Sequence, residues 1–178
     1  DRLHAGELHQ SIINALNTEI ISMCQQSGIS RHTLYEIVVV GNSTMRDLFF
    51  GLDVQSIGQR PYKSTTEHET LAGTRTGTQL EAGARELGVI ASPAGRVVSP
   101  PLVASHVGAD VSAGMVACDF DLGTGTRVYL DIGTNTEVVI ATSERIVAAS
   151  CPAGPAFEGG LVRHALPACD GAIDTLRA

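Results

Sequence analysis

The sequence has no tryptophan, few aromatic residues and few basic residues. Aromatic residues make up 4% of its 178 residues, and 12 lysines and arginines against 19 acidic residues give a formal net charge of -7. No block of basic residues is interleaved with aromatic ones. Because a nucleic-acid partner requires a basic surface, we expect no nucleic-acid binding.

Long apolar runs and clustered cysteines are also missing. The stretch Ile37–Val40 is far shorter than the roughly 18 residues of a membrane helix, and no secretion signal opens the sequence. We therefore expect no membrane partner and a cytoplasmic location. The cysteines are too far apart for a C-x-x-C metal or cluster site and are expected to be buried free thiols: Cys24, Cys118, Cys151 and Cys169.

What the sequence does contain is the composition of a folded α/β protein, with 43% hydrophobic and 17% charged residues. Apolar residues recur at every fourth position from Leu8 to Cys24, which predicts an amphipathic helix over residues 7–26 that ends at Gly28. The β-branched run at 36–41 then predicts a strand of a parallel sheet, buried on both of its faces.

A strand-to-helix junction follows this strand. Asn42 and Ser43 are good N-caps for a helix over residues 44–50, and we prefer that explanation of their presence. The alternative is that they face a ligand cleft at the carboxyl end of the strand. Periodicity is lost over residues 51–95, which predicts an irregular insertion whose only helical signal lies at 78–87.

The rest of the chain predicts a strand, a helix and a β-meander. The strand is expected at 96–99, and a helix rich in small residues at 106–118. The remaining elements are three strands and a short helix, at 126–132, 137–142, 145–151 and about 157–166. Because the meander starts a new sheet, we expect residues 1–120 to belong to one domain and residues 126–178 to begin another.

One segment, from Leu130 to Glu137, carries residues suited to phosphate binding. Asp131 follows an apolar strand and can hold a hydrated Mg²⁺. Gly133 lacks a Cβ, so backbone N–H groups can approach phosphate oxygens, and Thr134 and Asn135 add side-chain donors. The alternative is an ordinary hairpin in which Asp131 only favours the turn.

The surroundings of this hairpin resemble the superfamily of actin, sugar kinases and heat-shock chaperone ATPases. In that superfamily a D-x-G-x-T hairpin opens the second domain and contacts nucleotide phosphates. The helix of small residues before the hairpin and the loop at 153–160 after it keep the same order, over about residues 96–166. The resemblance implies an actin-like ATPase fold of RNase-H-like domains, with ATP and Mg²⁺ as cofactors.

Within that superfamily, five motifs resemble the reductive activators of corrinoid proteins. They are VVGNSTM at 39–45, PY at 61–62, HVGAD at 106–110, LDIGTN at 130–135 and AGPAFEG at 153–159. The resemblance implies ATP-driven reduction of Co(II) to Co(I) in a partner corrinoid protein. Such ATPases often carry an iron–sulfur cluster in a separate domain, so we expect any cluster to lie outside this chain.

The same resemblance gives the candidate site residues. Asp131 is the expected Mg²⁺ ligand. Where the chaperone ATPases have a glutamate just ahead of the helix of small residues, this sequence has Ser105 and His106. The nearest carboxylate, Asp110, is therefore the candidate catalytic residue that orients the attacking water or a metal-bound water. The residues expected near the nucleotide phosphates, besides Asp131, are Gly133, Thr134, Asn135, Gly154 and Glu158. Asp110 and Glu158 also have a simpler explanation, because acidic residues are favoured in the first turn of a helix by the helix dipole.

The departures from the superfamily concern parts that are missing. The sequence lacks the earlier phosphate hairpin of the first domain and the later glycine-rich adenosine loop, so it resembles the middle of a longer protein. We expect that longer protein to hydrolyse ATP and this part alone to be inactive. Two other functions stay open: a non-catalytic docking module for the corrinoid protein, and a small-molecule kinase. Whether the protein forms a homodimer also stays open.

Overall fold

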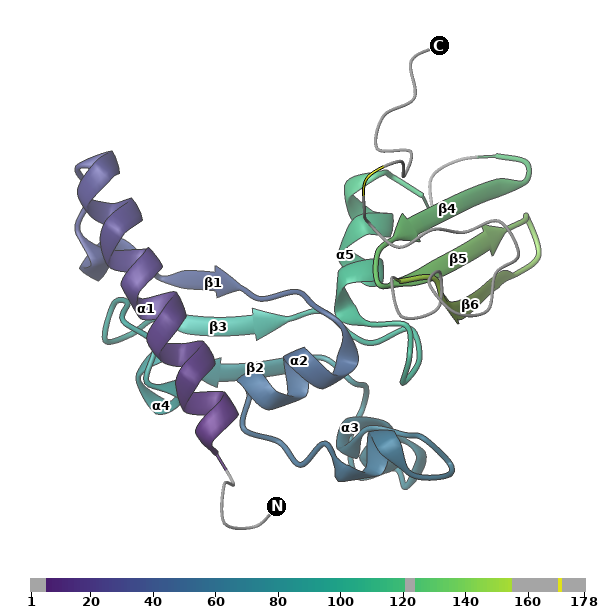
Figure 1. The fold of residues 1–178 in the computed structure, drawn as a ribbon, viewed down its shortest axis with the longest axis horizontal. Helices are drawn as coiled ribbons and strands as arrows, with labels where there is room; N and C mark the ends of the chain where they lie inside the picture. The colour runs from purple at the N-terminus through teal and green to yellow at the C-terminus, as the bar shows by residue number, and fades with distance from the viewer. Residues whose placement is uncertain (1–5, 121–123, 155–169, 171–178) are drawn as a thin grey trace. The chain divides into compact units, whose positions relative to one another are not determined.

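Two separate three-stranded sheets organise the chain (Figure 1). In this computed structural model the described residues are 6–120, 124–154 and 170. The chain divides into two compact units, Asp1–Cys118 and Asp119–Ala178, and each holds one of the sheets. None of the helices in the described residues is long and apolar enough to cross a membrane.

The sheet of the first unit mixes parallel and antiparallel pairing. Its strands are β1 (Glu36–Val38), β2 (Leu80–Gly83) and β3 (Arg96–Ser99), in the order β1-β3-β2. β1 runs parallel to β3, as the sequence predicts, and β2 runs antiparallel to β3. Glu36 pairs with Arg96 in the register and also binds its guanidinium.

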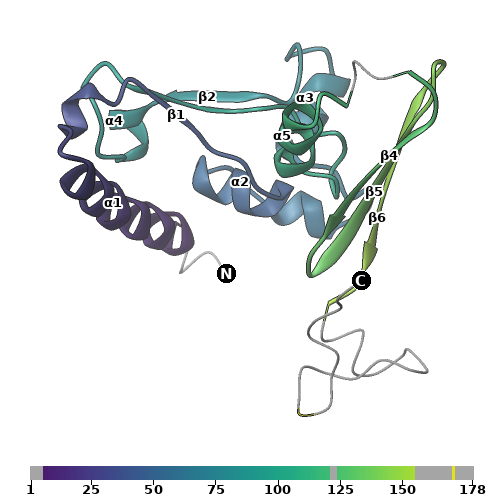
Figure 2. The same cartoon turned by 90° about the horizontal axis from the view of Figure 1, so that it is seen from above.

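Helices α1 (Glu7–Ser27) and α2 (Ser43–Phe49) lie on the same side of this sheet (Figure 2). α1 confirms the predicted helix, and it ends at Gly28, which adopts the left-handed conformation with φ 65°. The N-cap prediction for α2 is also confirmed, because the Asn42 side chain accepts a hydrogen bond from the Met45 N–H. The core between these elements is formed by Ile13, Phe49, Ala84, Leu87, Val89 and Val97.

The prediction that the strand at 36–41 is buried on both faces is wrong. Ile37 and Val39 pack against the core, whereas Val38 on the other face is 60% exposed. The reason is that α1 and α2 cover the same face, and that β1 is an edge strand in the sheet order. The sequence run therefore identifies the strand and its parallel partner, but not its burial.

Residues 51–95 contain more regular structure than the sequence predicts. A 3₁₀ helix at Gln55–Gly58 is followed by helix α3 (Thr65–Leu71), and the Ser64 and Glu67 side chains form a capping box at its start. The helix predicted at 78–87 is wrong over most of its length. Leu80–Gly83 is strand β2, because pairing with β3 satisfies its backbone, and only α4 (Ala84–Leu87) is helical.

Helix α5 (Ala109–Ala117) begins three residues later than the sequence predicts. Residues 104 and 107 form an isolated β-bridge instead, and Gly108 is extended, with φ -79° and ψ -171°. The backbone N–H groups of Ala109 and Asp110 both donate to the Gly41 carbonyl, at 3.0 and 3.3 Å. The start of α5 is thereby held against the loop that joins β1 to α2.

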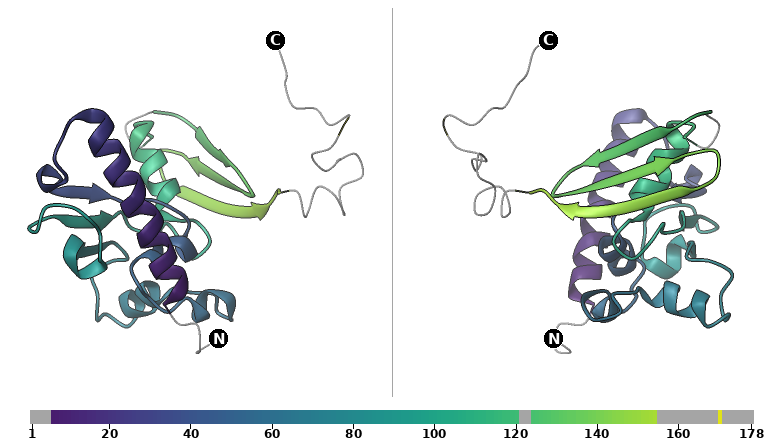
Figure 3. Two further views of the ribbon diagram at one scale, coloured as in Figure 1. Left: turned by 60° about the vertical axis from the view of Figure 1, so that its left-hand side comes forward. Right: turned by 90° about the vertical axis from the view of Figure 1, so that its right-hand side faces the viewer.

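The second unit contains the predicted β-meander. Its strands are β4 (Arg127–Ile132), β5 (Asn135–Ala141) and β6 (Ile146–Pro152), side by side and antiparallel in a sheet of their own (Figure 3). On one face, Val139 and Ala141 are buried, and Phe120 packs edge-on against Tyr129. The short helix predicted at about 157–166 lies outside the described residues.

The expectation that the cysteines are buried thiols holds for one of the three that are described. Cys24 is buried within α1, but Cys118 and Cys151 are exposed. Cys118 follows the last turn of α5, where the neighbouring Val116 is also exposed, and Cys151 lies on an edge strand. All three are free thiols.

Replacing Gly108 by alanine is expected to separate α5 from the β1–α2 loop. An added Cβ would lie 2.6 Å from the Asn42 Cα and 2.7 Å from the Gly41 oxygen, both of which are backbone atoms. We expect a loss of about 1–3 kcal/mol in local stability. Hydrogen exchange of the Ala109 and Asp110 amides should therefore be faster. Gly58→Ala is the control, because its Cβ would meet no atom of the described residues within 4 Å; equal exchange in both variants would contradict this prediction.

Candidate functional site

The register of the β4–β5 hairpin places two carboxylates directly opposite each other. Asp131 pairs with Glu137, and Glu137 pairs in turn with Ser150 on β6. Side chains of directly paired residues share one face of a sheet, so Asp131, Glu137 and Ser150 form a polar row. Ser150 donates to Glu137 at 2.8 Å, and the Tyr129 hydroxyl lies 3.5 Å from Asp131 Oδ2 on the same face.

This pair of carboxylates is chemically suited to a magnesium ion. Like charges that are directly opposite repel each other, and a bound cation removes that repulsion. Mg²⁺ prefers oxygen ligands and is usually held by one or two carboxylates together with water and phosphate oxygens. The part of the chain that the structure describes has no group of three or more His, Cys, Asp or Glu side chains that could hold a metal without such additional ligands.

The turn beside these carboxylates is tight and open to solvent. The Gly133 N–H donates to the Asn135 carbonyl at 2.9 Å, and the side chains of Thr134 and Asn135 are exposed. Among the described residues, a Cβ on Gly133 would meet only the Asn135 oxygen, at an ordinary 3.5 Å. Packing within the described part of the chain therefore does not require glycine at this position.

The loop after β6 returns to this turn. The Ala153 N–H donates to the Thr134 carbonyl at 3.2 Å, and a Cβ on the buried Gly154 would lie 2.8 Å from the same oxygen. The structure thus brings five of the predicted residues to one end of the meander: Asp131, Gly133, Thr134, Asn135 and Gly154. Glu158 lies outside the described residues.

The opposite face of the meander is apolar. Val128, Leu130 and Ile132 alternate with the polar-face residues of β4 and are exposed, and Ile132 is 78% accessible to solvent. The strand alternation therefore separates a face with carboxylates from a face without charge.

Asp110 lies in the first unit, in the first turn of α5. Its Oδ1 accepts a hydrogen bond from the Val111 N–H at 2.9 Å, so the side chain has the local role expected of an acidic residue at a helix start. The N–H groups of Ala109 and Asp110 are bound to the Gly41 carbonyl and are not available to an anion.

A buried ion pair on α2 was not predicted from the sequence. Arg46 and Asp47 are adjacent on α2, 1% and 0% exposed, and the guanidinium binds Asp47 Oδ1 at 2.7 Å. Arg46 also donates to the Thr66 hydroxyl at 3.0 Å and to the Thr78 carbonyl at 2.8 Å. Burial raises the pKa of Asp47, although Arg46 opposes that effect.

Glu67 was also missed by the sequence reasoning. Its Oε2 accepts hydrogen bonds from the Ser64 N–H, at 3.0 Å, and from the Ser105 hydroxyl, and Lys63 lies 3.7 Å from Oε1. Burial raises the pKa of Glu67, but the bonds from Ser105 and Ser64 outweigh it, so the pKa lies below its ordinary value. The spacing of Ser64 and Glu67, which is that of a capping box, was the available signal.

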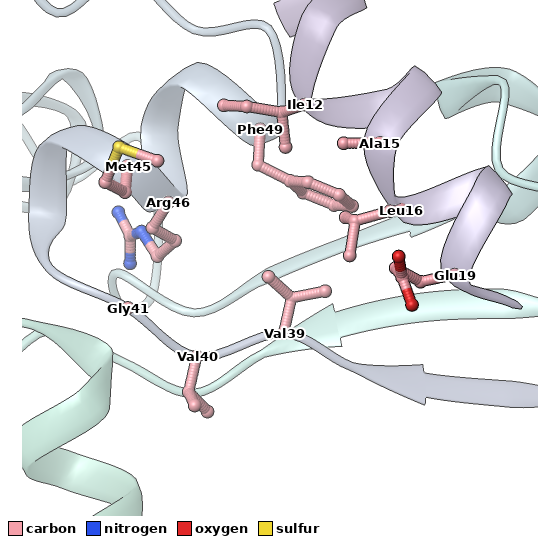
Figure 4. A pocket seen from close by; sticks show the side chains of 10 residues that line it. All are labelled: Ile12, Ala15, Leu16, Glu19, Val39, Val40, Gly41, Met45, Arg46 and Phe49. Atoms are coloured by element: carbon pink, nitrogen blue, oxygen red, sulfur yellow. The ribbon is translucent and has the colours of Figure 1, made fainter. Parts of the chain in front are cut away.

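An apolar cavity of about 360 Å³ lies between α1, α2 and the end of β1 (Figure 4). Leu16, Val39 and Phe49 point into it from these three elements, and Glu19 is the acidic residue among those that line it. None of the predicted site residues that the structure describes lines it.

Two family models match the chain in succession. The model described as the RACo middle region matches residues 1–123. The model described as the C-terminal domain of RACo, the ASKHA domain, matches residues 125–178. ASKHA denotes the actin-like ATPase fold, so this match and the solved structure below establish the fold that the sequence predicts.

Named relatives agree with these models. The chain is 28% identical over 169 residues to the corrinoid activation enzyme RamQ of Eubacterium limosum, covering 94% of this chain and 26% of RamQ. It is 36% identical over 77 residues to a [Co(II) methylated amine-specific corrinoid protein] reductase of Methanosarcina barkeri, covering 43% of this chain and 14% of that protein.

A solved structure, titled reductive activator for corrinoid,iron-sulfur protein, matches with a TM-score of 0.77 and 29% identity. The match covers 97% of this chain and 26% of that one. The chain thus spans about a quarter of the length of RamQ and of this structure.

Replacing Gly154 by alanine is expected to push the 153–154 loop away from the hairpin turn. The added Cβ would meet the Thr134 oxygen at 2.8 Å, its Cγ2 at 3.0 Å and its Cα at 3.1 Å. We expect a local cost of about 1–3 kcal/mol and loss of protection of the Ala153 amide in hydrogen exchange. Gly133→Ala, in the same turn, should leave that protection unchanged. Unchanged exchange of Ala153 in Gly154→Ala would show that the loop is not packed as described.

Proposed function

Because this chain belongs to the reductive activators of corrinoid proteins, we propose that it forms part of an ATPase that drives the one-electron reduction of a corrinoid protein in the cytoplasm. The cobalt of the partner changes from Co(II) to Co(I), and the electron comes from a low-potential reductant through an iron–sulfur cluster outside this chain. The observation that carries the proposal is the hairpin end at which Asp131, Glu137 and the open turn at Gly133 meet.

In this proposal each residue of the hairpin has a separate task. Asp131 binds Mg²⁺, and Glu137 adds negative charge on the same face. The exposed side chains of Thr134 and Asn135 donate to phosphate oxygens, and Gly133 leaves space for them. Gly154 keeps the adjoining loop close to the turn. Glu158, which lies outside the described residues, is proposed as a further residue near the phosphates. When bound, Mg²⁺ neutralises charge on the phosphates and polarises the phosphoryl group.

Asp110 has the proposed role of orienting the attacking water. Val111 holds one carboxylate oxygen, Oδ1, which fixes the side chain at the start of α5. ATP binding would favour a closed arrangement of the two domains. The closed arrangement would bind the corrinoid partner more tightly when its cobalt is in the reducible state, so ATP binding would favour that state.

Asp131→Asn is expected to abolish ATP-dependent formation of Co(I). The substitution keeps the size of the side chain but removes the charge that binds Mg²⁺, so ATP hydrolysis should fall by roughly a hundredfold. The measurement is the visible spectrum of a Co(II) corrinoid protein, mixed with the natural protein that contains this chain and a low-potential reductant, with and without Mg-ATP.

The matched control for Asp131→Asn is Glu144→Gln, which removes a carboxylate from the exposed turn that joins β5 to β6. It should leave the Co(I) band at the wild-type level. If the wild type hydrolyses ATP but produces no Co(I), coupling to a corrinoid protein is wrong and the kinase alternative gains support. If Asp131→Asn is fully active in Co(I) formation, the phosphate site is wrong.

Gly133→Ala is expected to weaken ATP binding without weakening the fold. The new Cβ makes only an ordinary contact inside the protein, yet it occupies the space that a phosphate group needs beside the turn. We expect an affinity loss of about tenfold, which corresponds to about 1.4 kcal/mol. Titration calorimetry with Mg-ATP measures the affinity, and thermal unfolding should be unchanged. A variant with wild-type affinity would contradict a phosphate contact at this turn.

A further inference from the structure

The segment that leads into α5 is a tight turn with a buried hydroxyl. The Val107 N–H donates to the Ala104 carbonyl at 3.0 Å, and the Ala104 N–H donates back to Val107 at 3.1 Å. Ser105 within this turn is only 6% exposed, and its hydroxyl donates to Glu67 of α3. Only Gly108 and Ala109 separate this turn from Asp110, so the position of the turn constrains the position of Asp110 in space.

Glu67 is a rigid partner for this hydroxyl. The Ser64 N–H binds the same oxygen, Oε2, and the Ser64 hydroxyl accepts from the Glu67 N–H at 3.2 Å. α3 is fixed in turn by Thr66, which is bound to the buried Arg46 of α2. Hydrogen bonds to a charged and largely buried acceptor are among the stronger ones in proteins.

The start of α5 is therefore held by the Gly41 carbonyl, which binds the Ala109 and Asp110 N–H groups, and by contacts of the turn before it. In that turn Ser105 binds Glu67, and the Ala104 carbonyl accepts a longer hydrogen bond, of 3.5 Å, from the Ser43 hydroxyl. If the contact with Glu67 is lost, the turn keeps only the weaker side-chain hydrogen bond and can shift while the helix stays folded. Such a movement displaces Asp110 without removing any residue of the hairpin site.

We propose that Glu67, acting through Ser105, is a positioning residue for Asp110. This inference rests on the proposed function, because it assumes that Asp110 orients the attacking water. The proposal gives Glu67, and with it helix α3, a role in ATP hydrolysis. None of the site residues predicted from the sequence lies in this segment, residues 51–95. Positioning affects the rate of the chemical step more than the binding of nucleotide.

The test compares Ser105→Ala and Glu67→Ala with Glu67→Gln in the natural protein that contains this chain. Ser105→Ala and Glu67→Ala remove the contact, and each should lower kcat for ATP hydrolysis about tenfold, within the roughly hundredfold loss that a displacement of about 1 Å can cause. The KM for ATP should change less than twofold. Glu67→Gln keeps an oxygen acceptor for Ser105 and a capping-box side chain, so it should recover most of the rate.

Thr70→Ala is the structural control. It removes a 2.7 Å hydrogen bond from the Thr70 hydroxyl to the Thr66 carbonyl within α3, and that bond does not involve the 104–107 turn. Its kcat should stay within about twofold of wild type. Equal losses of kcat in Thr70→Ala and Ser105→Ala, or an unchanged kcat in Ser105→Ala, would overturn the proposal.

Hydrogen exchange separates failure of this proposal from failure of the proposed function. The amides of Val107, Ala109 and Asp110 should exchange faster in Ser105→Ala than in wild type or Thr70→Ala. If the wild-type protein has no ATPase activity, the proposed function is wrong, and faster exchange still supports control of the α5 start by Glu67. Unchanged exchange at these amides overturns that control whatever the ATPase result.

Discussion

Burial of the Arg46 guanidinium constrains most of the first unit. A buried charge without partners costs several kcal/mol, so the chain must bring polar groups to it. Asp47 supplies the opposite charge, the Thr66 hydroxyl brings in α3, and the Thr78 carbonyl brings in the segment before β2. The Thr78 hydroxyl then accepts from the Leu102 N–H at 2.8 Å, so the same network reaches the segment that leads to α5.

The elements that the sequence predicted correctly are those whose signal is local. The helix over 7–26, its end at Gly28 and the Asn42 cap depend on neighbouring residues and are confirmed. The meander follows from alternation and turns and is confirmed. By contrast, the burial of Val38 depends on which side of the sheet α1 and α2 occupy, and no local pattern contains that information. Leu80–Gly83 likewise becomes a strand because β3 is there to pair with it.

In the candidate site, too, the features with a local sequence signal were predicted and those that depend on distant contacts were not. The motif from Leu130 to Glu137 indicated the hairpin, and a turn centred on Thr134 already implies that Asp131 faces Glu137, although the sequence reasoning did not draw that consequence. The approach of Gly154 to Thr134 was expected only as a loop near the phosphates. The Arg46 and Glu67 networks join residues up to 38 positions apart, and the capping-box spacing at Ser64 was their one local sign.

The alternation of the meander has a consequence for insertions and deletions. Strand side chains alternate with a period of two, so adding or removing one residue in a tight hairpin turn shifts the pairing of every residue beyond it. At the turn 133–134, that shift would take Glu137 out of register with Asp131 and mix the carboxylate face with the uncharged face. At the turn 143–144, the same shift would move β6 along β5 and take Ser150 out of register with Glu137, to which it donates a hydrogen bond at 2.8 Å. The polar row of Asp131, Glu137 and Ser150 therefore depends on the length of both turns of the meander.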